Sequence, residues 1–323
     1  MKRRLIKLAI FSIFTMNIFS NVYSMGSTNK PKPTPQPQPE EPSNPGGYKF
    51  GKRIGYNPSG VTENSGMVYS KTYERMYMIN DSGNGNYFFV TDMKGNLIEK
   101  VKINNAKNVD FEGLSYAPCD QDKCIYIGDI GDNSEDNSTH HVYIIKELNT
   151  FNKSASLKTD ITFTYEKGLT PNAESLAVHP ITGDIYIATK NYSGHSTFLY
   201  KISKSVFSGK SNVSTVAKLV GEVSYTTLES STKIDYTHTT DMAFSPSGEK
   251  FLLLTDQSRT VWEFSVDLSK FNYLNVNDVY DHYKVIPVDY LGQEESLTYY
   301  NENEFIYTTE GDSAPILQVK INK

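Results

Sequence analysis

Short runs of β-branched, aromatic and aliphatic residues follow one another along the chain from about residue 48 onward. Between them lie clusters of Gly, Asn, Asp, Ser and Pro, such as 94–96, 180–184 and 246–249, which are typical of turns. The pattern predicts strands at 74–80, 87–92, 97–103, 124–128, 141–147, 160–165, 184–189, 197–202, 250–255, 260–266, 304–309 and 315–321. Short helical turns are expected only at 204–208 and 274–282, so the chain is predicted to be all-β. The least regular stretch, 203–235, is predicted to be an insertion or a long outer hairpin.

One layout occurs five times among these strands. Each copy begins with a small polar or acidic residue, followed by Gly, Ser or Asp and then by Met or Leu, and these three residues open a strand. A second strand follows and ends in a charged residue about 16 positions after the first residue of the copy. The first positions are Ser65, Glu112, Glu174, Thr240 and Glu295, and the matching ends are Asp81, Asp129, Lys190, Asp256 and Glu310. A repeat of about 50 residues with several strands per unit indicates a β-propeller.

The number of blades follows from the last repeat. After Glu295 only 28 residues remain, which is enough for three strands, whereas a blade needs four. The segment 49–56 precedes the first repeat and is predicted to supply the missing strand, which would close the ring and remove its open edges. We therefore expect a five-bladed propeller over residues 48–323. The alternative is six blades, with one degenerate blade within 203–235.

The repeat also predicts which side chains share one face. In a blade the first strand lies nearest the axis and the second runs antiparallel beside it, so the start of the first and the end of the second meet at one end. The five first positions are therefore expected to form an inner ring around the channel mouth. The five matching ends are expected to form an outer rim on the same face.

The inner ring carries three carboxylates and two hydroxyls, and the rim carries four acids and Lys190. Like charges about 4 Å apart repel by about 4 kcal/mol at an effective dielectric constant of 20, so these acids must protonate or be neutralised by a cation. Oxygen ligands favour Ca²⁺, and the ring lacks the His or Cys that Zn²⁺ prefers. The sequence predicts one axial Ca²⁺ held by Ser65, Glu112, Glu174, Thr240 and Glu295. A channel mouth whose acids are merely solvated remains the alternative.

The N-terminal residues of the chain and its two cysteines predict export. Residues 1–24 combine Met-Lys-Arg-Arg, an apolar run and small residues before the expected cleavage point, which indicates a signal peptide. Residues 25–47 are rich in Pro and indicate an extended linker, and no transmembrane anchor is expected in the mature chain. The only cysteines, Cys119 and Cys124, flank a short hairpin turn. In a secreted or periplasmic compartment they are expected to form a disulfide.

Two resemblances arise at these motifs. The segments ENSGMVYS, NVDFEGLSYAP, GDIGDN, NAESLAVHP and EESLTYY resemble an uncharacterised family of secreted bacterial β-propellers, over roughly residues 60–315. That family carries no firm function to transfer.

More distantly, the same boxes resemble the secreted calcium-activated nucleotidase (apyrase) family. This resemblance implies a five-bladed propeller with one axial Ca²⁺, held by Ser or Glu side chains at the positions of the predicted inner ring. Thr240 stands where that family has Ser, and Gly113 stands where it has an aromatic residue. The ion site therefore transfers better than the nucleotidase activity.

Two functions from different classes remain open. A net charge of −5 argues against nucleic-acid binding, and no P-loop, GxSxG or HExxH motif is present. The first hypothesis is a monomeric module that binds an unidentified small molecule or protein at its acidic face. The second is a Ca²⁺-dependent hydrolase of phosphoanhydrides or phosphoesters, with Asp129, Glu310 and Lys190 as candidate catalytic residues.

Overall fold

The computed structural model describes residues 47–191, 195–228, 238–256 and 259–321. The predicted signal peptide (1–24) and nearly all of the predicted linker (25–47) lie outside these residues. In the described part, strands predominate, and the helical elements are one to two turns long. They are α1 (Lys204–Phe207), α2 (Tyr225–Leu228), α3 (Val276–Val279) and the 3-10 turns η1 (Glu166–Gly168) and η2 (Leu268–Lys270). The all-β prediction is therefore confirmed, and so are short helical turns within 204–208 and 274–282.

The strands form antiparallel groups of four in which the chain order is also the spatial order. The first group is β2 (Asn64–Ser70), β3 (Arg75–Asn80), β4 (Tyr87–Thr91) and β5 (Leu97–Asn104). The second is β6 (Phe111–Cys119), β7 (Asp122–Asp129), β8 (His140–Lys146) and β10 (Thr159–Tyr165), and the third is β11 (Ala173–Val178), β12 (Ile185–Thr189), β13 (Ser196–Ile202) and β14 (Asn212–Ser224). The fourth is β15 (His238–Phe244), β16 (Phe251–Asp256), β17 (Thr260–Phe264) and β18 (Tyr283–Pro287).

The last group is completed by the beginning of the folded chain. It consists of β19 (Glu294–Asn301), β20 (Glu304–Thr309), β21 (Pro315–Lys320) and β1 (Gly51–Tyr56). Strand β1 pairs antiparallel with β21, as the sequence predicts. Gly55 is needed here because a Cβ atom would lie 2.1 Å from the carbonyl oxygen of Lys94. This pairing joins the two ends of the fold and covers the edge that β21 would otherwise expose.

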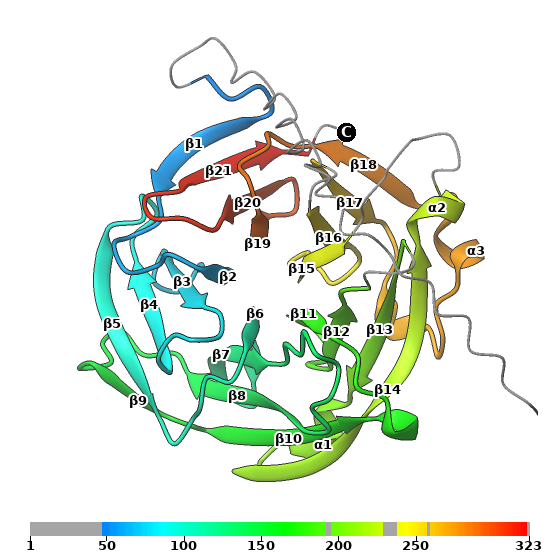
Figure 1. The fold of residues 1–323 in the computed structure, drawn as a ribbon, viewed down its shortest axis with the longest axis horizontal. Helices are drawn as coiled ribbons and strands as arrows, with labels where there is room; N and C mark the ends of the chain where they lie inside the picture. Colours follow the sequence, from blue (N-terminus) through cyan, green and yellow to red (C-terminus); the bar gives the residue numbers. More distant parts are fainter. Residues whose placement is uncertain (1–46, 192–194, 229–237, 257–258, 322–323) are drawn as a thin grey trace, which may run out of the picture. The chain divides into compact units, whose positions relative to one another are not determined.

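The first strands of the groups surround a common axis. Strands β2, β6, β11, β15 and β19 each contact the next one, and β19 contacts β2, so they form a closed ring in the centre of the molecule (Figure 1). The later strands of each group lie progressively farther out. Apolar clusters fill the space between neighbouring groups, for example Leu114, Ile79 and Ile127 between the first and second. The molecule is an all-β, propeller-like arrangement of sheets.

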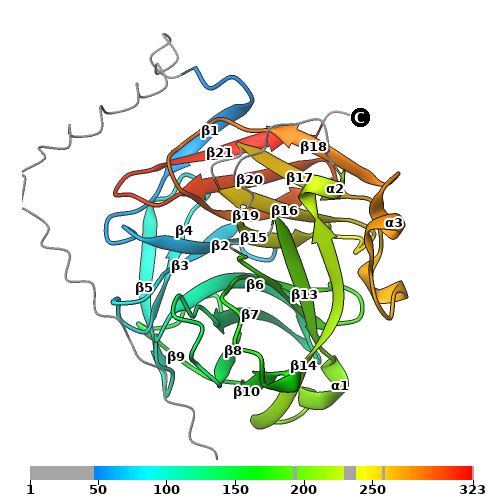
Figure 2. The ribbon, with the colours of Figure 1, turned by 45° about the vertical axis from the view of Figure 1, so that its right-hand side comes forward.

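Two outer pairings were not predicted. Strand β14 runs parallel to β10, which joins the second and third groups into a single eight-stranded sheet. The two strands lie side by side in both ribbon views (Figure 1; Figure 2). The short strand β9 (Ser154–Ser156) adds to the first group, parallel to β5. The region predicted as an insertion or outer hairpin instead contains this long strand β14, and residues 229–235 of it lie outside the described part of the chain.

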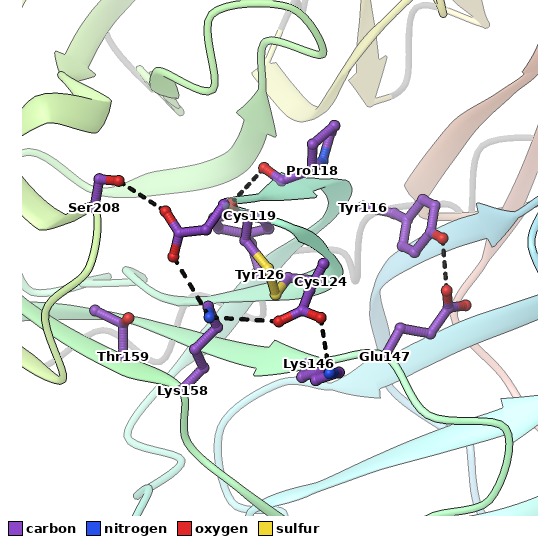
Figure 3. The surroundings of a disulfide bond; sticks show 12 residues. Tyr116, Pro118, Cys119, Cys124, Tyr126, Lys146, Glu147, Lys158, Thr159 and Ser208 are labelled. Atoms are coloured by element: carbon purple, nitrogen blue, oxygen red, sulfur yellow. Dashed lines mark hydrogen bonds and ion pairs between the residues drawn. A yellow bond between two sulfur atoms is a disulfide. The ribbon is translucent and has the colours of Figure 1, made fainter.

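The predicted disulfide is present. Cys119 ends β6 and Cys124 lies in β7, and their Cα atoms are 5.7 Å apart (Figure 3). The turn between them is also held by charge, since Asp122 pairs with Lys146 at 2.7 Å and Lys158 lies 3.4 Å from Asp120. No helix among the described residues is long and apolar enough to cross a membrane.

Candidate functional site

A β-bulge interrupts the pairing of the first and second strands in every group, and it falls at the predicted inner-ring residue each time. In β2 the register passes from Asn64 to Gly66, and in β11 it passes from Ala173 to Ser175. The same break leaves Thr240 and Glu295 outside the regular pairing, and in β6 it leaves out Glu112 together with Gly113. Bulges redirect a side chain and often lie beside functional sites. Five bulges at equivalent positions therefore mark this end of the axis.

The residue after each ring position fits the narrow space between neighbouring inner strands. A Cβ on Gly113, whose φ is +145°, would lie 2.7 Å from the backbone nitrogen of Leu176 in the next strand. Asp241 is fully buried and accepts a 2.6 Å hydrogen bond from the backbone N–H of Leu297. The Ser296 hydroxyl donates to Asn64 at 2.6 Å. These second positions connect one inner strand to the next.

The two hydroxyl residues of the ring are anchored to neighbouring strands. Ser65 donates to the carbonyl of Phe111 at 2.5 Å, and Thr240 donates to the carbonyl of Glu294 at 2.7 Å. Each hydroxyl uses its proton in this bond, so its lone pairs remain available to accept a hydrogen bond or bind a cation.

The three glutamates of the ring are buried, with 8 % or less of each residue exposed. Burial holds the pKa of Glu112 well above its ordinary value, and the negative charges of Glu174, Asp110 and Glu295 add to the effect. Burial likewise raises the pKa of Glu295, with Glu174 the next cause. The pKa of Glu174 is also raised by burial, although a nearby ammonium group opposes the shift. The charge of Glu174 thus acts on both Glu112 and Glu295, and the charge of Glu295 acts on Glu112.

The ammonium group belongs to Lys190. Its Nζ lies 2.6 Å from Oε2 of Glu174, and the lysine side chain is 12 % exposed. Its charge also lowers the pKa of Glu112 and Glu295. Lys190 was predicted to lie on the outer rim, but it acts as a counter-ion of the inner ring. It forms a direct ion pair with one of the three glutamates, Glu174.

The other rim residues differ in their surroundings. Asp81 is about half-buried, and burial together with the charges of Glu63, Glu310 and Asp110 raises its pKa to about 7. Asp129 accepts hydrogen bonds from the backbone N–H groups of Val109 and Asp110, so it organises the turn before β6.

The remaining two rim acids lie close to the glutamate ring. The pKa of Glu310 is raised by burial and by the charge of Glu63, while Lys190 opposes the shift. Asp256 is buried, and its charge raises the pKa of Glu295.

Asp110 is a member of this acidic face that the repeat did not identify. Its Oδ1 is buried and has no hydrogen-bond partner among the described residues. A Cβ on Gly131 would lie 2.3 Å from its Oδ2, so the glycine makes room for the carboxyl group. Burial raises the pKa of Asp110. Its place two residues before Glu112, in the segment VDFEG, was the available signal. The first repeat also has an acid at this offset, Glu63, whereas the last three repeats have none.

The donor set matches a hard cation. The ring residues offer hydroxyl and carboxylate oxygens, and the charge of the Asp110 carboxyl group acts on Glu112. In the part of the chain that the structure describes, no three His, Cys, Asp or Glu side chains form a metal-ligand group by themselves. A cation here would therefore also need the hydroxyl oxygens or water as ligands, which suits Ca²⁺ better than Zn²⁺.

Comparison with protein-family models finds no match, and comparison with curated proteins finds none either. Among solved structures, the chain is similar to the PQQ-bound form of aldose sugar dehydrogenase from Streptomyces coelicolor. The identity is 10%, the match covers 85% of this chain and 98% of that one, and the TM-score is 0.45.

Two further solved structures are similar. One is a chain of a nidogen/laminin complex, at 12% identity, covering 77% of this chain and 73% of that one, with a TM-score of 0.42. The other is hydrazine synthase from Kuenenia stuttgartiensis, at 10% identity. The match covers 82% of this chain and 98% of that one, with a TM-score of 0.41. A likeness of this degree transfers no activity, ligand or partner to this chain.

Proposed function

We propose that this chain is an exported five-bladed β-propeller that binds Ca²⁺ at the acidic end of its inner ring and serves as a binding module for a small molecule or protein. The observation that carries the proposal is the recurrence of one bulge in every group, each time at a ring residue. Three of those residues are buried glutamates opposed by a single ammonium group.

The blade number is supported by the ring of inner strands. Each of the five has its own group of four strands, and the groups follow one another around the axis. The rival with six blades needs a further group within 203–235. The described part of that range contributes β14 to the third group and the short helices α1 and α2.

The ion is proposed on grounds of charge and donor chemistry. Glu112 and Glu295 would hold Ca²⁺, with Ser65 and Thr240 contributing hydroxyl oxygens and Glu174 shared with Lys190. A divalent cation would relieve the repulsion that raises the pKa of these glutamates. It would act by tying five inner strands together at one end, which is a structural role.

Thermal unfolding in EDTA and then across Ca²⁺ and Mg²⁺ titrations tests this proposal. A ligand bound only by the folded state stabilises it by about 2.7 kcal/mol at a 100-fold excess over Kd. Glu112→Gln keeps the shape of the side chain and removes its charge, so we expect the Ca²⁺-dependent rise in melting temperature to shrink strongly. The exposed Glu249→Gln is the matched control and should keep the full rise. An equal rise in both variants, or no rise in the parent protein, would refute the axial site.

A second candidate function is hydrolysis of a phosphoanhydride or phosphoester at the same face. The observation that favours it is the pKa of Asp81, about 7, which suits a general base or acid at neutral pH. Lys190 could bind a phosphate oxygen, and bound Ca²⁺ would supply Lewis-acid assistance. Glu310 remains a candidate base, whereas Asp129 is already engaged by two backbone N–H groups. Turnover of nucleotide and sugar phosphates in Ca²⁺, absent in Asp81→Asn, would establish an enzyme.

Export is proposed from the sequence of residues 1–24 and is supported by the disulfide, since disulfides persist in oxidising compartments. We propose that residues 25–47 link the signal peptide to the folded part, residues 48–323.

A further inference from the structure

The inner strands enclose a second feature at the end opposite the glutamates. A cavity of about 360 Å³ lies there, and all five inner strands or the turns that follow them contribute to its lining. The lining residues are Val68 and Tyr69 of β2, Leu114–Pro118 of β6, Val178 of β11, Met242–Phe244 of β15 and Leu297–Tyr300 of β19. They follow the ring residues by two to six positions, or roughly 7–20 Å along a strand. The cavity is therefore distinct from the acidic site.

The floor and walls of this cavity are apolar and aromatic. Leu114, Met242 and Leu297 are buried on the inner strands. Above them Tyr69 and Tyr300 lie with ring centroids 4.9 Å apart, and Tyr300 is 36 % exposed. An apolar surface of this kind gains free energy when a ligand covers it, at about 25 cal/mol per Å². The volume is within the range of roughly 300–1,000 Å³ found for small-molecule pockets.

Several polar groups of the wall are already paired within the protein. The Tyr69 backbone N–H donates to Oγ1 of Thr298 at 3.3 Å, and the Val178 N–H donates to the hydroxyl of Ser115 at 2.9 Å. The Tyr116 hydroxyl donates to Glu147 at 2.6 Å (Figure 3), and Tyr116 is one of the residues that line the cavity. These pairs leave few polar groups for a ligand, so apolar contact with flat side chains must supply much of its affinity.

The charged residues at the entrance of the cavity indicate the charge of a ligand. Lys71 and Lys123 line the cavity and are exposed, and among the described residues that line it there is no carboxylate. Two buried acids lie behind this wall. Glu147 accepts hydrogen bonds from Tyr116, Tyr77 and Ser70, and Glu263 accepts one from Tyr299. The entrance is thus basic, although the whole chain carries a net charge of −5.

We propose that this cavity is a binding site for a small, flat, apolar molecule that carries one anionic group, such as an aromatic carboxylate or sulfonate. The apolar part contacts Tyr69, Tyr300 and the floor, and the anionic group lies between Lys71 and Lys123.

A pair of probes that differ in one charged group tests the proposal. The first, 8-anilinonaphthalene-1-sulfonate, is aromatic and anionic, and N-phenyl-1-naphthylamine has the same aromatic system without the sulfonate. Fluorescence titration of the purified protein should show one saturable site for each. Lys71→Ala combined with Lys123→Ala should weaken binding of the sulfonate about three- to tenfold and change binding of the neutral probe less than twofold.

Two further variants separate the site from nonspecific effects. Lys52→Ala combined with Lys102→Ala removes the same charge from exposed positions on β1 and β5 and should leave both probes unaffected. Tyr300→Ala should weaken both probes, with a melting temperature close to that of the parent because the side chain is partly exposed. Absence of saturable binding, or equal weakening by both lysine pairs, would overturn the proposal. Binding of both probes unchanged in Tyr300→Ala would overturn it as well.

Discussion

At one end of the ring of inner strands, the ring residues leave the regular pairing and bring buried carboxyl groups together around Lys190. At the other end, leucine, methionine and tyrosine side chains of the same five strands line a cavity, and two exposed lysines are the only charged side chains among the described residues of that lining. The same five strands therefore contain two environments: one in which buried charges must be paired, and one in which apolar groups must be closely packed. Burying like charges is costly unless they are paired, whereas burying apolar groups is favourable.

The two ends should therefore respond differently to solution conditions. We expect the stability of the acidic end to depend on pH, on the proposed cation and on the ammonium group of Lys190, because its free energy is dominated by charge. We expect the stability of the apolar end to depend on volume and close packing, because its buried leucine and methionine side chains have no charge to titrate.

The largest expected effect comes from Lys190→Met. Removing one partner of a buried ion pair costs about 3–5 kcal/mol, because the remaining carboxylate stays buried without compensation. We expect a lower melting temperature at pH 7 and partial recovery in Ca²⁺ or at lower pH. Calorimetry or circular dichroism melting checks this. Lys218→Met, on a 64 % exposed side chain, is the control and should change little. A variant as stable as the parent would show that Lys190 is not the counter-ion of the ring.

A comparable or slightly smaller effect is expected from Leu297→Ala at the apolar end. The side chain is 1 % exposed, and such truncations cost about 2–5 kcal/mol through lost burial and the cavity left behind. In contrast to Lys190→Met, the loss should be the same with EDTA and with Ca²⁺, and similar between pH 5 and 8. Urea unfolding in the four conditions measures it. If Ca²⁺ restored the stability of Leu297→Ala, the two ends would not be independent.

The smallest expected effect is a change in pH dependence. The pKa of Asp81 is about 7 in the folded protein, above its ordinary value of 3.8, so the folded state holds the proton more tightly than the unfolded state. Its contribution to stability is fully present below pH 3.8 and is lost as the pH rises through 7. Asp81→Asn should therefore flatten the decline in stability between pH 4 and 7.

Part of this slope should persist in Asp81→Asn, because Glu63, Glu310 and Asp110 face Asp81. Urea midpoints measured across this range compare the variant with the parent. Identical slopes would show that Asp81 does not titrate where its surroundings indicate.

The sequence by itself determined the alternation of strands and turns, the five repeated boxes, the closing strand 49–56 and the disulfide, because each is carried by local pattern. It also brought the three ring glutamates to one end, since antiparallel geometry links the start of one strand to the end of the next. The chemistry of that end was only partly predictable. The antiparallel repeat placed Lys190 at the same end as Glu174, as one member of an outer rim, but it did not predict the direct ion pair between them.

Only the tertiary structure decided the rest. The parallel pairing of β10 with β14 joins segments about 50 residues apart, and no local pattern encodes a partner at that distance. The apolar cavity escaped sequence reasoning for the same reason. Tyr69, Phe244 and Tyr300 each look like an ordinary strand residue, and they become a site only when five inner strands place them around one axis. A sequence repeat predicts the features that its units share. A site also depends on residues that differ between the units and that only the fold brings close together.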